Sequence, residues 1–228
     1  MQGQVVRAQR GDRANYRPIV STLCGSSDPL AVARILCRHC ASTRLYVADL
    51  DALQGRAAQL EVLQALLAAL PEVELWLDAG FAGADAAASL RRAFGAAAPR
   101  VRPVIASESL PSRAAFEDAF GPGGRAGAEA LLSLDRRDGT RLDAAGCWDT
   151  PQWWPAQVIV MTLERVGADS GPDLDTLSAV RDRSPAARVI GAGGIRDAAD
   201  LARAEAAGAW AWLVASALHD GRLPPRAA

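Results

Sequence analysis

The stretch from Arg188 to Ala209, RVIGAGGIRDAADLARAEAAGA, decides the fold of this chain. It opens on a short apolar run, passes through glycines at 191, 193 and 194, and continues as an alanine-rich segment with helical spacing. Glycine enters positive φ without a steric cost, which suits a tight turn between a strand and a helix. Glycines in such a turn also let backbone N–H groups approach an anion. The stretch therefore predicts a strand, a turn and a helix, with phosphate binding as one of two explanations for the glycines.

Similar units recur along the whole chain. Short apolar runs alternate with helical patterns, which is typical of a parallel sheet covered by helices. We count seven such runs: RLYVADLD (44–51), VELWLDAGF (73–81), VRPVIASESL (101–110), AEALLSLDRRDG (128–139), AQVIVMTLERVG (156–167), RVIGAGGIRD (188–197) and AWAWLVASALHDG (209–221). No Ser-rich or Pro-rich linker divides them, so we expect one domain over residues 1–228.

An internal repeat distinguishes a closed barrel from an open sheet. DAGFAGADAAASL (78–90) resembles GAGGIRDAADLA (191–202), and the strand after each copy ends in an Ala–Ser pair, at 106–107 and 215–216. A two-fold repeat of four strand–helix units predicts a (βα)8 barrel. In such barrels function lies at the carboxyl ends of the strands.

Composition excludes several classes of protein. The chain has 228 residues, half of them apolar, and a net charge of −1. No apolar run reaches membrane-spanning length. The sequence also has no stripe of basic residues of the kind that would predict a nucleic-acid partner. Every basic side chain other than histidine is an arginine, which excludes lysine imine chemistry and a P-loop. The four cysteines are too sparse for a disulfide scaffold, and the CRHC motif (37–40) lacks a second pair for zinc. We expect a cytoplasmic protein without a cofactor.

The glycine-rich turn is the strongest candidate binding site. A phosphate site commonly follows the seventh and eighth strands of a barrel. The predicted donors are the N–H groups of Gly193, Gly194 and Ile195 in one turn, and of Ala215 and Ser216 in the next. The expected partner is a small phosphorylated metabolite.

Several motifs carry a resemblance to a known family. YVADLDALQG, LLSLDRRDG, VGADSGPDL and the glycine-rich stretch resemble the HisA/HisF-like barrels of histidine biosynthesis, which are the ProFAR isomerase and its cyclase-synthase relative. GQVVRAQRG resembles HisA-related proteins of methanogens and methylotrophs, which are associated with tetrahydromethanopterin- or methanofuran-linked one-carbon metabolism. The resemblance implies a (βα)8 TIM barrel of the ribulose-phosphate-binding type, with isomerase- or lyase-type acid/base chemistry.

The resemblance also implies catalytic residues. Asp135 matches the family's general-acid aspartate on the fifth strand, and Thr162 matches an assisting threonine on the sixth. From the residues alone, Asp135 is a general acid or a carboxylate capping the DRRDG turn. The family's second carboxylate ends a first strand, and Met1 follows directly after that position. We therefore expect either a natural chain with a further strand or a seven-stranded barrel, its gap covered by residues 3–8 or by a second copy of the chain. In both cases we expect no two-carboxylate catalysis from these 228 residues.

The first copy of the repeat departs from the family pattern. LDAGF stands where a GGG-type turn is expected, so that Asp78 introduces a carboxylate and Phe81 removes a flexible position. Glu108 adds a second negative charge nearby. Because desolvated carboxylates repel phosphate dianions, we expect a ligand with one phosphate rather than two.

Further acidic and aromatic residues complete the predicted mouth of the barrel. Asp49, Asp51 and Glu164 fall near strand ends and are suited to a cation or an amine-bearing substrate. No histidine joins them, so we expect no transition-metal site, and Mg²⁺ is the only reasonable metal. Trp148, in the loop WDTPQWWP, is expected to cover the substrate.

Three functions remain open at this point. The first is an isomerase or lyase acting on a mono-phosphorylated substrate. The second is a non-catalytic phosphate-binding or assembly protein. The third is the ProFAR isomerase itself, which the altered first copy of the repeat disfavours.

Overall fold

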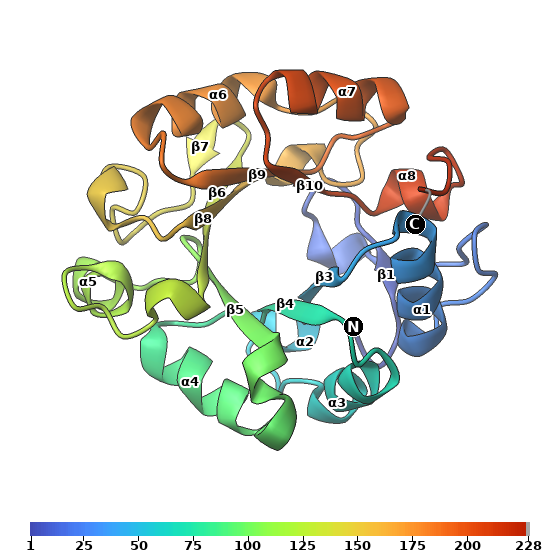
Figure 1. Cartoon of the computed structure of the whole chain (residues 1–228), viewed down its shortest axis with the longest axis horizontal. Coiled ribbons are helices and arrows are strands. Elements are labelled where there is room, and N and C mark those ends of the chain that lie inside the picture. The colour runs from blue at the N-terminus through green and yellow to red at the C-terminus, as the bar shows by residue number, and fades with distance from the viewer. Residues whose placement is uncertain (227–228) are drawn as a thin grey trace.

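The computed structural model describes residues 1–226 and contains the expected α/β barrel. A ring of strands is surrounded by helices (Figure 1). Seven parallel strands follow the order β10-β9-β8-β6-β5-β4-β3. Their bounds are β3 (Arg44–Ala48), β4 (Glu74–Asp78), β5 (Val101–Ala106), β6 (Leu131–Arg137), β8 (Gln157–Thr162), β9 (Arg188–Ala192) and β10 (Ala211–Leu213). A short strand β7 (Thr140–Arg141) folds back on β6.

The helices lie outside the strands and begin at capping residues. They are α1 (Pro29–Cys40), α2 (Leu50–Leu53), α3 (Leu60–Ala69), α4 (Ala84–Arg92), α5 (Arg113–Phe120), α6 (Leu174–Arg183), α7 (Ala198–Ala206) and α8 (Ser216–His219). Before α1, α6 and α7, the side chains of Asp28, Asp173 and Asp197 accept a hydrogen bond from an N–H of the first turn. These caps satisfy amide groups that would otherwise lack partners. No helix within residues 1–226 is long and apolar enough to cross a membrane.

Alternate residues of the strands build two apolar layers. Leu132, Leu134 and Val158 belong to the larger cluster, which they share with residues of the outer helices. Leu131 and Ile159 belong to a smaller cluster made of strand and strand-end residues, which fills the barrel. Because side chains alternate along a strand, Asp135 on β6 faces the interior together with Leu131.

The sheet ends at β3 and β10, and no strand pairing joins these two within residues 1–226. No residue of either strand is buried, whereas every residue of β8 is. At the amino ends of the strands, Trp210 stacks on Trp76 with ring centroids 6.4 Å apart. The guanidinium groups of Arg44 and Arg188 lie 5.3 and 5.2 Å from the Trp210 ring. This aromatic cluster connects residues from both sides of the gap.

Residues 3–8 pair with neither β3 nor β10, so they do not complete the sheet, but they contact both sides of the gap: the Gly3 N–H donates to Gln59, which follows β3, and Arg7 forms an ion pair with Asp220, which follows β10. Within them, β1 (Val6–Arg7) pairs antiparallel with β2 (Arg17–Pro18) and forms a hairpin. The reason is local, because an antiparallel hairpin can close within a few residues of chain. The loop of this hairpin contacts the end of β6 and the segment that follows β8: Arg137 donates to the Gly11 carbonyl at 3.2 Å, and Arg10 N–H donates to the Val166 carbonyl at 2.8 Å. The hairpin thus lies against the carboxyl ends of the strands.

Candidate functional site

Asp135 is a buried carboxylate at the carboxyl end of β6. Only 3% of the surface of Asp135 is exposed. Ser133 Oγ donates to Oδ1 at 2.7 Å, and Ser107 Oγ and the Glu108 N–H both donate to Oδ2 at 3.2 Å. Ser107 Oγ also accepts the N–H of Asp135 at 2.9 Å. These contacts hold both carboxylate oxygens in one orientation inside the barrel.

The environment of Asp135 makes it able to exchange a proton near neutral pH. Burial raises the pKa of Asp135 to about 7, and the charges of Glu108 and Asp78 add to that rise. The hydrogen bonds from Ser133 and Glu108 act in the opposite direction. A carboxyl group with this pKa is suited to act as a general acid or base.

Asp78 lies at the end of β4 and also faces the interior. The Tyr46 hydroxyl donates to Oδ2, and the Gly80 N–H donates to Oδ1, each at 3.2 Å. Burial raises the pKa of Asp78 to about 6, and Glu108 contributes to the rise. Asp78 therefore already has internal donors on both oxygens.

Glu108 forms an ion pair with Arg13 of the N-terminal hairpin. Arg13 comes from the 3-10 turn η1 (Arg13–Asn15) between β1 and β2. A cleft of about 320 Å³ lies beside this pair and is lined by Arg13, Ala52, Leu53, Gly55, Gly80, Glu108 and Ser109.

The glycine-rich turn after β9 has the conformation that the sequence predicts. Gly193 and Gly194 have φ values of +83° and +84°. A Cβ atom on Gly194 would lie 2.1 Å from the Gly171 carbonyl oxygen, so no other residue fits there. Within residues 1–226, the N–H groups of Gly193, Gly194 and Ile195 donate to no protein acceptor. The same is true of Ser216 and Ala217 in the neighbouring turn.

Comparison with known proteins decides the family. The sequence model of a family described as "Histidine biosynthesis protein" matches residues 1–224. The chain belongs to this family.

Individual relatives in the histidine biosynthesis protein family are distant. An uncharacterized protein of Methanocaldococcus jannaschii is 24% identical over 225 residues, which cover 96% of this chain and 89% of the relative. The 1-(5-phosphoribosyl)-5-((5-phosphoribosylamino)methylideneamino) imidazole-4-carboxamide isomerase (ProFAR isomerase) of Xylella fastidiosa is 27% identical, with 97% and 83% coverage. The protein of the same name from Corynebacterium diphtheriae is 28% identical, with 96% and 90% coverage.

Thr162, which the family resemblance singles out, lies apart from Asp135. In the register between β6 and β8, Asp135 pairs with Met161 and Arg136 pairs with Thr162. Asp135 and Thr162 therefore point to opposite faces of the sheet. The Thr162 hydroxyl donates to the carboxylate of Asp173 at 2.9 Å. Asp173 caps α6, so this hydroxyl contacts the outer layer in this histidine biosynthesis family member.

Two predicted acidic residues of the mouth have different surroundings. Asp49 caps α2, and its second oxygen accepts the Gln59 N–H at 2.7 Å. Glu164 lines a cleft of about 440 Å³ together with Arg10 and Arg165. No group of three metal-ligating side chains occurs within the part of the chain that the structure describes.

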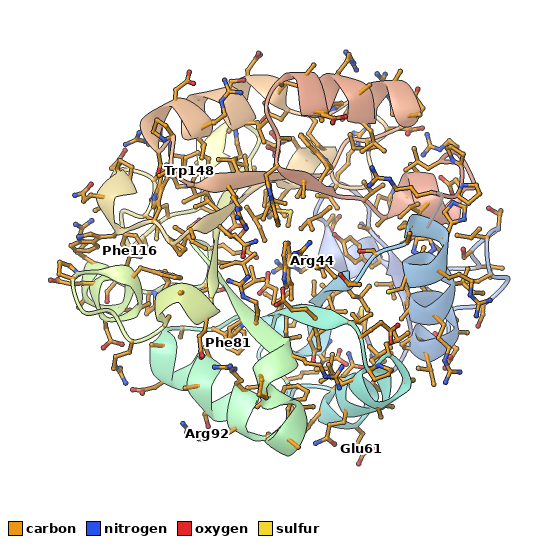
Figure 2. The ribbon with its side chains drawn as sticks, in the orientation of Figure 1. Arg44, Glu61, Phe81, Arg92, Phe116 and Trp148 are labelled. Atoms are coloured by element: carbon orange, nitrogen blue, oxygen red, sulfur yellow. The ribbon has the colours of Figure 1, made fainter. Side chains whose placement is uncertain are left out.

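Trp148 does not cover the mouth of the barrel. It is 4% exposed and belongs to the cluster between strands and helices. Figure 2 shows it outside the ring of strands, on the side of α6. Arg141 lies 5.0 Å from its ring centroid. The loop packs against the core because burying the Trp148 indole stabilises the fold more than leaving it exposed as a lid would.

Phe81 is likewise a core residue rather than a lost flexible position. The β4 turn and the β9 turn have equal lengths, from strand ends at Asp78 and Ala192 to helix starts at Ala84 and Ala198. Phe81 therefore corresponds to Ile195, and both are buried. Figure 2 shows Phe81 between the strands and α4. The glycine that the first turn lacks is the counterpart of Gly193, where this chain has Ala79.

Sequence reasoning missed four residues of the site. Ser133 lies two positions before Asp135 on the same strand, so strand alternation was a usable signal for it. Ser107 was visible only as part of the repeated Ala–Ser pair. Nothing in the sequence pattern connects Arg13 or Tyr46 to the site, because their contacts depend on the tertiary fold.

Proposed function

We propose that this chain binds one phosphate group of a small metabolite at the β9 turn and moves a proton on that metabolite through Asp135. The reaction class is an isomerisation or a lyase-type elimination, both of which need a positioned acid or base. One observation carries the proposal: the N–H groups of Gly194 and Ala217 have no acceptor within residues 1–226, whereas those of their counterparts in the first half, Gly80 and Glu108, donate to carboxylates.

The free N–H groups support a single anion site. Five backbone donors from two adjacent turns have no protein acceptor within residues 1–226. Two of them belong to residues in the left-handed region, Gly193 and Gly194. Successive N–H groups in such turns form concave sites that bind phosphate oxygens. Buried amides without a partner are unfavourable, so a bound anion would stabilise the turn.

The corresponding turn in the first half argues against a second phosphate. The Gly80 N–H donates to Asp78, and the Glu108 N–H donates to Asp135. A phosphate dianion there would displace these carboxylates and meet their charge. The names of the isomerase relatives include two phosphoribosyl groups. We therefore infer a mono-phosphorylated substrate rather than the ProFAR isomerase substrate.

Phosphate titration tests the binding site. We expect inorganic phosphate to raise the melting temperature of the wild type and to bind with a stoichiometry of one by calorimetry. Ser216→Asp places a carboxylate beside the free N–H groups and should weaken phosphate binding by roughly tenfold or more. Ser216→Asn has nearly the same shape without the charge and should retain binding. Equal phosphate affinities in the wild type and Ser216→Asp would contradict the proposal.

Solvent deuterium incorporation tests the chemistry separately. Aldose, ketose and aminoaldose monophosphates are incubated with the protein in D₂O, and exchange at carbon is followed by NMR. We expect exchange for at least one of them and its loss in Asp135→Asn. Phosphate binding without exchange in any of them would support the non-catalytic alternative.

A further inference from the structure

Arg13 lies near the N-terminus and Asp135 in the middle of the sequence, and one residue connects them in the structure. Glu108 lies between them. Its backbone N–H donates to Asp135 Oδ2 at 3.2 Å, and its side chain pairs with the guanidinium of Arg13. The side chains of Arg13 and Glu108 are 27% and 16% exposed, so this ion pair is shielded from water more than a surface pair.

We propose that Arg13 is a positioning residue for Asp135 and acts through Glu108. The guanidinium pairs with the Glu108 carboxylate, compensates its charge and keeps the Glu108 N–H directed at Asp135. This proposal rests on the proposed role of Asp135 in proton transfer, although its test does not require turnover.

The hairpin gives Arg13 a defined position. Asp12 caps the η1 turn by accepting the Ala14 N–H at 3.2 Å. The loop is held on one side by the bond from Arg10 N–H to Val166, and β1 is held by the ion pair between Arg7 and Asp220. Contacts at both ends of the hairpin therefore limit how far Arg13 can move from Glu108.

Arg13 supplies the positive charge to a group of acidic side chains. The titratable groups that face Asp135 are Asp78 on β4 and Glu108 after β5, and the Tyr46 hydroxyl on β3 donates to Asp78. The thiol of Cys147 lies in the apolar layer between strands and helices, where its pKa is raised in part by the Asp135 charge. Burial raises the pKa of Asp135, and Glu108 is the largest contributor among the neighbouring charges. With Arg13 removed, the Glu108 charge is no longer compensated, and ionisation of Asp135 becomes less favourable.

Direct titration of Asp135 tests the proposal. The carboxyl carbon is followed by NMR on protein labelled with ¹³C aspartate, and its signal is assigned from its absence in Asp135→Asn. We expect Arg13→Gln to raise the titration midpoint by roughly one pH unit. Arg13→Lys keeps the charge and should restore most of the wild-type midpoint.

Two controls separate this role from a structural one. Arg17→Gln removes a hairpin arginine whose side chain, within residues 1–226, donates only to the carbonyls of Ala14 and Tyr16, and it should leave the midpoint unchanged. In a Glu108→Gln background, Arg13→Gln should no longer shift the midpoint, because the charge through which it acts is absent.

The proposal is overturned if Arg13→Gln moves the midpoint no more than Arg17→Gln does. It is also overturned if the shift persists in the Glu108→Gln background. Circular dichroism at each pH confirms that the variants remain folded, and the Arg13→Lys variant decides the case if Arg13→Gln does not fold. Loss of phosphate binding or of deuterium exchange has no bearing on this titration, so the two proposals fail independently.

Discussion

The two strand-end turns after β4 and β9 have the same length but differ in one hydrogen bond. The Gly80 N–H donates to Asp78 within its own turn, at 3.2 Å. Its counterpart, the Gly194 N–H, has no acceptor within residues 1–226. The residue that makes this difference ends the strand, where β4 has Asp78 and β9 has Ala192. With a methyl group at the strand end, the turn can bind an external anion. With a carboxylate there, the N–H group donates to that carboxylate instead.

The neighbouring turns repeat this contrast. The Ala–Ser pairs after β5 and β10 are followed by Glu108 and Ala217. The Glu108 N–H donates to Asp135, whereas the Ala217 N–H has no acceptor in the described chain. In the first half, each of these two turns therefore directs an N–H group at a carboxylate, whereas the equivalent N–H groups of the second half remain available to an anion. The two halves of the repeat thus share a backbone conformation at these turns but differ in the hydrogen bonds that their N–H groups make.

The largest expected effect comes from adding a side chain at the two equivalent glycines. Gly194→Ala places its Cβ 2.1 Å from the Gly171 carbonyl oxygen, so the backbone must move. We expect a loss of about 4 kcal/mol or more in the free energy of unfolding. At Gly80 the nearest atom is Leu53 Cα at 3.2 Å, and we expect Gly80→Ala to cost only about 1–2 kcal/mol. Urea unfolding measures both, and equal costs would contradict the structural difference between the turns.

The second prediction concerns Asp135, the buried carboxyl group that accepts the Glu108 N–H of the first half. The folded pKa of Asp135, about 7, lies above its unfolded value, so its stabilising contribution is present below about pH 4 and is lost as the pH rises to about 7. Asn cannot ionise. We therefore expect the free energy of unfolding of Asp135→Asn, relative to that of the wild type, to rise by about 2–4 kcal/mol between pH 4 and pH 8.

Urea unfolding at several pH values measures this difference. Asp182→Asn provides a matched control, because the Asp182 side chain is 73% exposed and its replacement should show no such trend. A pH-independent difference between Asp135→Asn and the wild type would mean that Asp135 is ionised throughout this range.

The smallest effect is expected from making the first half resemble the second. Asp78→Ser with Glu108→Ala removes both carboxylates from the first pair of turns and frees the Gly80 N–H. We expect a second, weak phosphate site, contributing less than about 1 kcal/mol of stabilisation at millimolar phosphate. Calorimetry would show two binding events in place of one. A stoichiometry that stays at one would mean that backbone shape, rather than the carboxylates, excludes a second phosphate.

For the inner strands, the sequence does not show which face of the sheet a residue points to. Asp135 and Thr162 both end apolar strands, and the motifs alone place them together. The strands of a covered parallel sheet are apolar on both faces, so they show no alternation from which to read orientation. The register between β6 and β8 settles it and separates Thr162 from Asp135. Trp148 illustrates the same limit, because a tryptophan in a loop sequence does not show whether it packs inward or remains exposed.

The sequence by itself determined the strand–helix alternation, the two-fold repeat, the glycines of the β9 turn and the replacement of a glycine-type turn by Asp78. These are local features, since periodicity and positive φ depend on neighbouring residues. Only the tertiary structure decided the surroundings of Asp135. Arg13 reaches Glu108 across 95 positions of sequence, and Arg7 reaches Asp220 across 213. Such contacts form where the chain returns to the same end of the barrel, and no local pattern encodes them.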